Sequence, residues 1–270
     1  MCRDISFHSE IQIVTQDFKG IQLAPNLAHY PNDMVHVTCE ILPTHPIVVN
    51  RKALVLANMS WGVVPTYIDD PRERQLQRSN MVNARSERII GDKKSYWYRL
   101  RNNRCLIPAT GIYEHREVKG FRNKIPYHIS LEGRKGFYVP ALYQVSQEVD
   151  QDTGEIFNFA SFTMITRHAN DKMMWIHNSG DNKHRMPLFL TPEMEHAWVL
   201  DDLSDDDMEE FFHFEMPSDN IAHYPVYTIR GRKPVTEDIV PDAYYDWGKK
   251  LPVYGQESNS TEDTQSSLFF

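Results

Sequence analysis

The sequence predicts a single α+β domain with a mainly antiparallel, strongly bent sheet or open barrel and a few flanking helices. Short β-rich runs dominate the chain, and they do not alternate regularly with helical segments. No internal repeat and no Pro/Gly/Ser-rich linker divides the first 250 of the 270 residues, a length sufficient for one large core. We therefore expect one domain over residues 1–254 and a polar, disordered tail over residues 255–270.

The expected strands are seven runs rich in β-branched and aromatic residues. They comprise residues 34–40, 53–61, 104–108, 125–131, 136–143, 157–166 and 222–229. Helices are expected over residues 169–176, 191–200 and 205–212. The second begins with Thr191, Pro192 and Glu193, a strong helix-start pattern. The third has acidic residues in its first turn, where they interact favourably with the helix dipole.

The composition is that of an ordinary globular protein, with 41% hydrophobic and 24% charged residues. No apolar run approaches the roughly 18 residues of a membrane span, and the start of the chain lacks the layout of a secretory signal. We therefore expect a cytoplasmic protein. The three cysteines form no CxxC pair, which argues against a disulfide framework or a zinc ribbon. Cys39 and Cys105 are interpreted as small buried hydrophobic residues.

The formal net charge of −8 conceals an uneven distribution. Residues 71–124 contain 14 Lys/Arg and five Asp/Glu, whereas residues 201–215 contain eight acidic residues and no Lys or Arg. Two interpretations stay open. The segments form either two solvated surfaces of opposite sign or a basic, phosphate-binding face on an otherwise acidic protein.

Cys2 stands out because of its position. With Met1 removed, it presents an amine and a thiol on adjacent carbons. Such a 1,2-aminothiol condenses with an aldehyde to a Schiff base, and the thiol then closes a five-membered thiazolidine ring. An unperturbed terminal amine has a pKa of about 7.7–8.0 and an unperturbed thiol a pKa of about 8.5, so both nucleophiles are partly available near neutral pH.

Further along the chain, several motifs follow in a fixed order. They are Trp61-Gly62-Val63-Val64-Pro65, Asn83-Ala84-Arg85-Ser86-Glu87, residues 104–114 (RCLIPATGIYE), Thr166-Arg167-His168-Ala169-Asn170, and Ile176-His177 followed by Arg185-Met186-Pro187. Together with a cysteine at position 2, they resemble the signatures of the SOS-response-associated peptidase family. The resemblance extends from Cys2 to about Leu190.

The resemblance implies that Cys2 bonds covalently to abasic sites in single-stranded DNA, and that the same site removes residues ahead of Cys2. Asn83 would orient Cys2 and its amine, and Glu114 would act as the general acid and base. His177 would protonate the ring oxygen of the sugar to hold the abasic site as an open aldehyde. No metal ion or organic cofactor is implied, and in a bacterium the protein would associate with the nucleoid.

Arg85, Arg3 and Arg185 are the cations that the same resemblance assigns to DNA binding. Arg3 stands where the family has glycine, and it is assigned the phosphate contact usually made one residue later. Trp61 and Tyr67 are the aromatic residues expected to stack on bases of a single strand. Tyr67 stands where a tryptophan is common in the family.

The position of the catalytic histidine stays open between two candidates. In the family it usually lies two residues before the arginine of Arg-x-Pro, where this chain has Lys183. His177 is the candidate if six residues are inserted before Arg185, and His184 is the alternative. The Ile-His context favours His177.

The end of the tail contains Gln265, Leu268 and Phe269, in the sequence Gln-Ser-Ser-Leu-Phe-Phe. This resembles the short peptide by which many bacterial repair proteins bind the sliding clamp. The alternative interpretation is a tail that docks on its own domain or ends in apolar residues by chance.

Two other function classes remain as alternatives. One is a cysteine hydrolase of unrelated substrates with Cys2, His177 and Glu114 as a triad. The other is a non-catalytic adaptor that binds single-stranded DNA. The first predicts turnover of peptides or esters, and the second predicts DNA retention that does not depend on Cys2.

Overall fold

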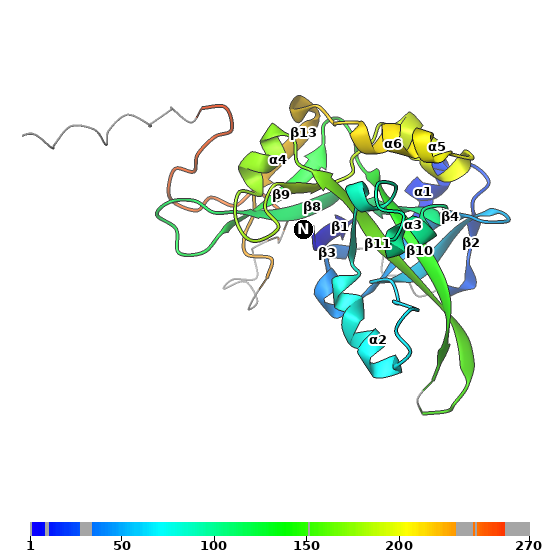
Figure 1. The fold of residues 1–270 in the computed structure, drawn as a ribbon. Coiled ribbons are helices and arrows are strands. Elements are labelled where there is room, and N and C mark those ends of the chain that lie inside the picture. Colours follow the sequence, from blue (N-terminus) through cyan, green and yellow to red (C-terminus); the bar gives the residue numbers. More distant parts are fainter. Residues whose placement is uncertain are drawn as a thin grey trace, which may run out of the picture.

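Five strands of the larger sheet close into a barrel in the computed structural model, which describes residues 2–8, 11–27, 34–150, 152–230, 240 and 242–256. In barrel order they are β5 (Leu54–Trp61), β4 (Thr44–Asn50), β7 (Arg104–Ala109), β10 (Phe137–Val149) and β11 (Ile156–His168). Successive pairs are antiparallel, and β11 returns to β5 through the parallel pairs Ser161–Ser60 and Phe162–Trp61. The predicted α+β class is confirmed, and its bent sheet closes on itself (Figure 1).

Three short strands extend this sheet. The strand β2 (Gln22–Leu23) pairs with β5, while β6 (Asn83–Arg85) and β12 (Arg185–Pro187) both pair with β11. Since β6 and β12 each carry motif residues, β11 brings two segments that are about a hundred residues apart into one region.

The second sheet has the order β13 (Ile221–Pro225), β9 (Ile125–Leu131), β8 (Gly111–Arg116), β1 (Asp4–Phe7) and β3 (Met34–Thr38), and all its pairs are antiparallel. The amino-terminal strand β1 is therefore an internal strand, with Asp4 opposite both Tyr113 and Thr38. In Figure 1 it lies in the middle of the molecule. This insertion fixes the position of Cys2, which precedes β1.

The helices are short. They are α1 (Ile11–Asp17), α2 (Pro71–Gln77), α3 (Tyr96–Leu100), α4 (Asp171–Ile176), α5 (Pro192–Leu200) and α6 (Asp205–His213), with one-turn 3-10 helices at Pro25–Leu27, Cys39–Ile41, Arg78–Asn80, Ser86–Arg88 and Ser218–Asn220. The predicted start of α5 is confirmed, because Thr191 accepts a hydrogen bond from the amide of Met194. Among the described residues, no helix is long and apolar enough to cross a membrane.

Alternating residues of the barrel strands face two different hydrophobic clusters, as the two-residue period of a strand requires. On β7, Cys105 and Ile107 belong to the cluster shared with the second sheet, whereas Leu106 belongs to the cluster beneath α5 and α6. Cys39 and Cys105 are both buried, as predicted. Cys2 belongs to the cluster shared with the second sheet.

Part of the basic segment lies against the acidic one. The Arg101 guanidinium is 2.6 Å from the Asp205 carboxylate at the start of α6, and Arg104 donates to the carbonyls of Trp198 and Asp201. These contacts hold α5 and α6 on the barrel. Two separate solvated surfaces of opposite sign therefore do not describe these residues, because the basic side chains of Arg101 and Arg104 contact the acidic segment.

The sequence-based elements differ from the structure in several places. The strands β1, β4 and β8 were not expected, and the strand expected over residues 222–229 ends at Pro225. There Val226 forms only an isolated bridge with Tyr244, so the ladder with β9 stops. Strand β11 is longer at both ends than expected. The tail from residue 257, with Gln265, Leu268 and Phe269, lies outside the described residues.

Candidate functional site

The site is centred on Cys2, which is fully buried and lies two residues before the start of β1. The neighbouring carbonyl of Arg3 accepts a hydrogen bond from the amide of Cys39 at 2.8 Å, which extends the β1–β3 pairing towards the chain end. The carbonyl of Cys2 accepts a hydrogen bond from Nδ2 of Asn83 at 3.0 Å. The backbone of Cys2 is thus held from two directions.

Asn83 is the first residue of β6 and is itself buried. Its position follows from the parallel pairing of β6 with β11, in which Asn83 lies opposite Met164. Its second amide atom, Oδ1, is a buried acceptor without a hydrogen-bond partner among the described residues. Asn83 therefore has an acceptor left for a donor next to Cys2.

Glu114 reaches Cys2 from the other side, from strand β8. It is 5% exposed, and its carboxylate lies close enough to the Cys2 thiol to act on its pKa. Burial of the thiol, together with the nearby negative charge of Glu114, raises the pKa of Cys2 well above its ordinary value. The thiol is therefore protonated in the resting protein, with a base already in contact.

His177 lies directly after α4 and is 8% exposed. Its Nε2 atom is 3.9 Å from Oε2 of Glu114, and its Nδ1 atom is 3.0 Å from the carbonyl oxygen of Arg185. A carbonyl can only accept, so Nδ1 carries a hydrogen whether or not the ring is charged. Proton exchange is thereby directed to Nε2, the atom that faces Glu114.

The loop of residues 178–183 explains the spacing of the two histidine candidates. The amide of His184 donates to the carbonyl of His177 at 2.9 Å, so the six intervening residues leave and return at one point. His184 itself has a positive φ of 61°, which turns the chain into β12. The structure places His177, and not His184, beside Glu114.

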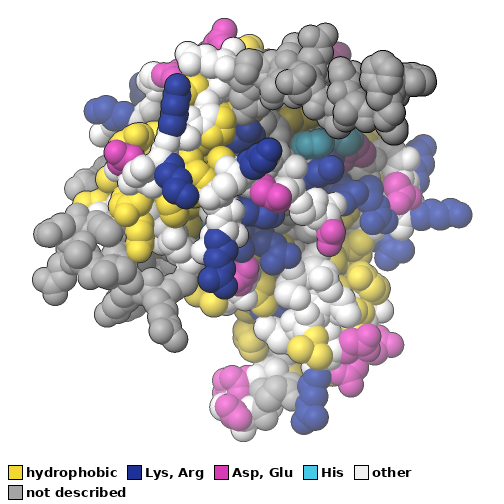
Figure 2. Space-filling model, turned by 90° about the vertical axis from the view of Figure 1, so that its left-hand side faces the viewer, with side chains coloured by type: hydrophobic (Ala, Val, Ile, Leu, Met, Phe, Trp, Pro, Cys, Tyr) yellow, Lys and Arg dark blue, Asp and Glu magenta, His cyan; other side chains and the backbone are white. Residues whose placement is uncertain are grey.

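Two hollows with basic linings flank the buried cluster formed by Cys2, Asn83, Glu114 and His177. The first, of about 290 Å³, is lined by Glu114 and His177 together with the cations Arg3, Lys124 and Arg230. Figure 2 shows Lys and Arg side chains gathered across the middle of one face of the molecule.

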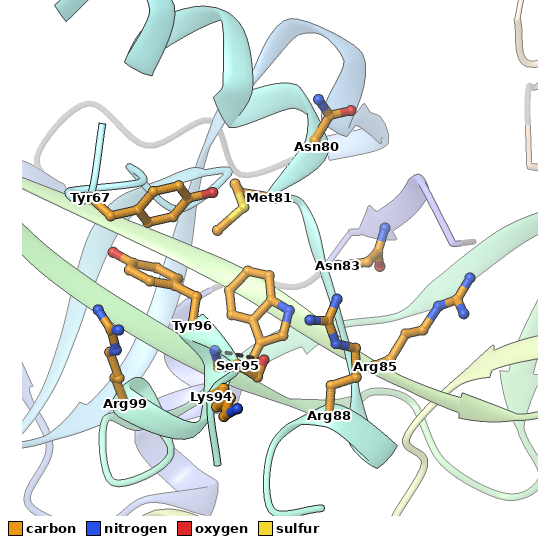
Figure 3. Close-up of a pocket in the computed structure, with 11 residues that line it drawn as sticks. Tyr67, Asn80, Met81, Asn83, Arg85, Arg88, Lys94, Ser95, Tyr96 and Arg99 are labelled. Carbon is orange, nitrogen blue, oxygen red and sulfur yellow. Dashed lines mark hydrogen bonds between the residues drawn. The ribbon is translucent and has the colours of Figure 1, made fainter. Parts of the chain in front are cut away.

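The second hollow, of about 650 Å³, has Asn83 on its wall. Its cations are Arg85, Arg88, Lys94 and Arg99. In Figure 3, Arg85 and Arg88 lie on the side of Asn83, and Tyr67, Tyr96 and Arg99 lie on the opposite side. A basic, phosphate-binding face is thus the arrangement that these residues support.

The two aromatic residues expected to stack on bases differ in their exposure to solvent. Tyr67 is 58% exposed and packs edge-on against Tyr96 at the second hollow. Trp61 is fully buried, stacks on Phe162 and donates its ring N–H to the carbonyl of Val82. The assignment of Trp61 to base stacking is therefore corrected, because neither face of its ring is open to a nucleotide.

The three arginines assigned to DNA also differ. Arg85 is exposed at the second hollow and donates to Oδ1 of Asn182 at 3.2 Å, and Arg3 lines the first hollow 3.7 Å from the Glu40 carboxylate. Arg185 is 5% exposed and paired with Glu87. Arg185 thus differs from Arg85 and Arg3 in being buried and in pairing with a carboxylate of the protein itself, so its assignment to DNA stays a prediction.

Sequence reasoning missed a network that anchors β1 next to Cys2. The buried carboxylate of Asp4 is 2.8 Å from Nε2 of His36 and pairs with Arg230, which also lies 3.0 Å from Glu40. Burial alone would raise the pKa of Asp4, but the hydrogen bonds from His36 and Arg230 lower it. No local pattern signals this network, because His36 lies 32 residues and Arg230 lies 226 residues from Asp4.

Sequence reasoning also missed Tyr96, Lys94 and Arg99 as lining of the second hollow. Their signal was the Tyr-Trp-Tyr run of residues 96–98 inside the basic segment. Among the described residues, no group of three or more His, Cys, Asp or Glu side chains is arranged to hold a metal ion.

These features define a class of protein: an α+β barrel domain in which a cysteine next to the chain start meets a carboxylate and a histidine between two basic hollows. The model of the family described as SOS response associated peptidase (SRAP) matches residues 1–231, and the chain belongs to this family.

Curated relatives include the abasic site processing protein YoqW of Bacillus subtilis, which is 27% identical over 85% of this chain and 93% of its own length. The abasic site processing protein HMCES of Gallus gallus is 27% identical over 73% of this chain, which spans 63% of that longer protein. A crystal structure of a protein from Bacteroides thetaiotaomicron has a TM-score of 0.71 at 25% identity, and covers 83% of this chain and 92% of its own.

Proposed function

We propose that this protein acts on abasic sites in single-stranded DNA and captures them covalently through the amine and thiol of Cys2. The observation that carries the proposal is the convergence of Cys2, Asn83, Glu114 and His177 between two basic hollows. The names of the relatives YoqW and HMCES support abasic sites as the substrate. Removal of Met1 precedes the reaction, and the same site acts as the autopeptidase.

Binding depends on the two hollows and not on the net charge of the chain. The exposed cations Arg85, Arg88 and Lys94 hold phosphates on the side of Asn83, and Arg3 and Lys124 hold them on the side of Glu114. Tyr67 provides a stacking face that tolerates any base. The DNA strand crosses the cluster of Cys2, Asn83, Glu114 and His177, so that the sugar of the abasic site lies next to Cys2.

The reaction begins when the neutral amine of Cys2 adds to C1′ of the open sugar and forms a carbinolamine. Glu114 in its acid form donates a proton to the departing hydroxyl, so that water leaves and a Schiff base remains. The Cys2 thiol then adds to the same carbon while its proton passes to the Glu114 carboxylate, and the ring nitrogen ends as a secondary amine. The sum is one aldehyde and one aminothiol giving one thiazolidine and one water.

The raised pKa of the thiol fits this order of events. A thiol that stays protonated leaves the amine as the first nucleophile, and the nearby Glu114 carboxylate takes the proton of the thiol at ring closure. Asn83 fixes the backbone of Cys2, and its free Oδ1 is an acceptor for the amine. His177 supplies a proton from Nε2 to the ring oxygen of the closed sugar while the C1′ hydroxyl gives its proton to Glu114, so that the ring opens to the aldehyde.

The spatial arrangement of Cys2, Glu114 and His177 disfavours the alternative function of a cysteine hydrolase. In a hydrolase triad the imidazole lies next to the thiol and favours its ionisation. Here the carboxylate of Glu114 contacts the thiol and raises its pKa, and the imidazole lies beyond the carboxylate.

A trapping assay tests the proposed function. Single-stranded DNA with one abasic site is incubated with the mature protein and with Cys2→Ala, and denaturing gels measure the linked fraction. A tetrahydrofuran analogue, which has no aldehyde, serves as the matched DNA control. We expect linkage only with Cys2 and a true abasic site. Equal retention of the analogue, or linkage by Cys2→Ala, would instead support an adaptor or a different nucleophile.

A second proposal concerns the sliding clamp of a bacterium as a partner of the tail. Gln265, Leu268 and Phe269 supply a polar contact and two apolar side chains in a segment outside the described residues. A short linear peptide binds with modest affinity, because fixing its conformation costs free energy. The intact chain and a version ending at Thr264 are compared for clamp binding, and equal binding would end this proposal.

A further inference from the structure

The Arg185 side chain connects the two segments that carry Asn83 and His177. Its Nη1 and Nη2 atoms lie 2.5 and 3.0 Å from the two carboxylate oxygens of Glu87, which follows β6 in the 3-10 helix Ser86–Arg88. Its Nη2 atom also donates to the carbonyl of Thr166 on β11 at 2.7 Å. A single guanidinium thereby links β12, β11 and the segment after β6.

The main chain of Arg185 acts on the catalytic imidazole directly. Its carbonyl accepts the hydrogen of Nδ1 of His177 at 3.0 Å. The carbonyl is held by the pairing of Arg185 with His168 on β11, and the guanidinium fixes the same residue from its other end. The amide of His184 closes the loop by donating to the carbonyl of His177. His177 is thus fixed through residue 185, although eight positions separate them.

The charges at this contact are matched. Partial burial would raise the pKa of Glu87, but the hydrogen bond from Arg185 lowers it, so the carboxylate stays ionised opposite the guanidinium. A bidentate arginine–carboxylate pair fixes both distance and orientation, which a lysine cannot reproduce. The last residue of the Asn-Ala-Arg-Ser-Glu motif and the first residue of Arg-Met-Pro are therefore partners in space.

We propose that Glu87 and Arg185 form a positioning brace that keeps the transferable proton of His177 on Nε2 and sets its distance from Glu114 and Asn83. The inference rests on the proposed function for its catalytic consequence, but its structural part stands without DNA. In this arrangement the terminal nitrogens of Arg185 bond to Glu87 and Thr166 inside the protein, whereas Arg85 lies on the exposed surface.

The test compares Arg185→Lys and Glu87→Gln with Arg85→Ala as the matched phosphate-contact control. Binding of tetrahydrofuran-containing single-stranded DNA is measured between low and moderate salt, and single-turnover linkage is measured at saturating abasic DNA. The ring nitrogens of His177 are followed by ¹⁵N NMR in each protein without DNA. Glu87→Gln keeps an acceptor at a partly exposed position, so it provides a folded variant if Arg185→Lys is unstable.

We expect both brace variants to lower the linkage rate at least tenfold at unchanged affinity and salt dependence, and to lose the single Nδ1–H signature of His177. Arg85→Ala should weaken binding and reduce the salt dependence without changing the imidazole. A brace variant that behaves like Arg85→Ala and keeps the wild-type imidazole signals would overturn the proposal. If wild-type protein forms no linkage, the proposed function fails, and the NMR comparison alone still decides whether the brace exists.

Discussion

The side-chain amide of Asn83 donates to the carbonyl of Cys2 at 3.0 Å and so joins the start of the chain to the edge of the barrel. This hydrogen bond connects β6 of the larger sheet to Cys2, which lies two residues before the start of β1 of the second sheet. The proposed capture of an abasic site would depend on this contact, because a chain start that was free to move would not keep its amine and thiol against Glu114.

Asn83→Ala removes this hydrogen bond and should slow linkage about fivefold, since one hydrogen bond contributes about 1 ± 0.5 kcal/mol net. Single-turnover rates on abasic single-stranded DNA measure the effect. Asn80→Ala is the matched control, because Asn80 lines the same hollow but bonds only to Gln77. Equal rates for Asn83→Ala and wild type would contradict the anchoring role.

Glu114→Gln should slow linkage by roughly 10²–10⁴, the usual contribution of a general acid and base. Removal of the carboxylate also removes a charge that raises the pKa of the Cys2 thiol, although burial still raises it. Alkylation of Cys2, followed across pH by peptide mass spectrometry, should therefore begin at lower pH in the variant. An unchanged alkylation profile would show that Glu114 does not act on the thiol.

Tyr67→Ala should weaken binding of single-stranded DNA by about 1–3 kcal/mol, because one base loses its stacking partner. Tyr67→Phe should bind like wild type, and fluorescence anisotropy measures both. Trp61→Phe is the contrasting change, because Trp61 is buried and its ring N–H bonds to Val82. It should lower thermal stability and leave DNA affinity unaltered, and the reverse pattern would restore Trp61 as the stacking residue.

Asn182 offers a test of Arg85 as a phosphate ligand. The amide oxygen of Asn182 accepts from the Arg85 guanidinium at 3.2 Å, and a DNA phosphate would replace it. Asn182→Asp should weaken DNA binding several-fold at low salt, because an ion pair now competes with the phosphate, whereas Asn182→Ala should bind at least as tightly as wild type. Tight binding by Asn182→Asp would argue against Arg85 as a phosphate contact.

Stability should fall as the pH decreases from about 6.5 towards 4. Burial lowers the pKa of His45, His128 and His223 to about 4, so between these values the unfolded chain binds more protons than the folded protein. Chemical unfolding at a series of pH values measures the slope. His45→Gln should make it shallower, and a free energy of unfolding that is constant over this range would contradict the assignment.

Much of the fold could be predicted from local sequence patterns. The strand Ile125–Leu131 was placed correctly, the start of α5 follows from the pattern that begins at Thr191, and the start of α6 follows from its early acids. The closure of the barrel could not be predicted, because it depends on the parallel pairing of two residues of β5 with β11, and no local period encodes such a contact. Strand β1 was missed because it is only four residues long and its neighbours come later in the chain.

The site could be assembled from motifs only as a set of candidates. The resemblance indicated Cys2, Asn83, Glu114 and a histidine, and the structure supplied the distances that connect them. The burial of Trp61 and Arg185 could not be predicted, since a residue type does not show whether its side chain faces solvent or core. The insertion of six residues before Arg185 was one of two alternatives in the sequence, and the meeting of the two ends of the loop of residues 178–183 supports it.

Intact-mass analysis of the mature protein before and after incubation with abasic single-stranded DNA tests the central claim most directly. We predict a protein without Met1 that gains the mass of the DNA minus one water, and no such product with Cys2→Ala or Cys2→Ser. A mature chain that retains Met1, or an adduct of the same mass on Cys2→Ala, would contradict capture through the amine and thiol of Cys2.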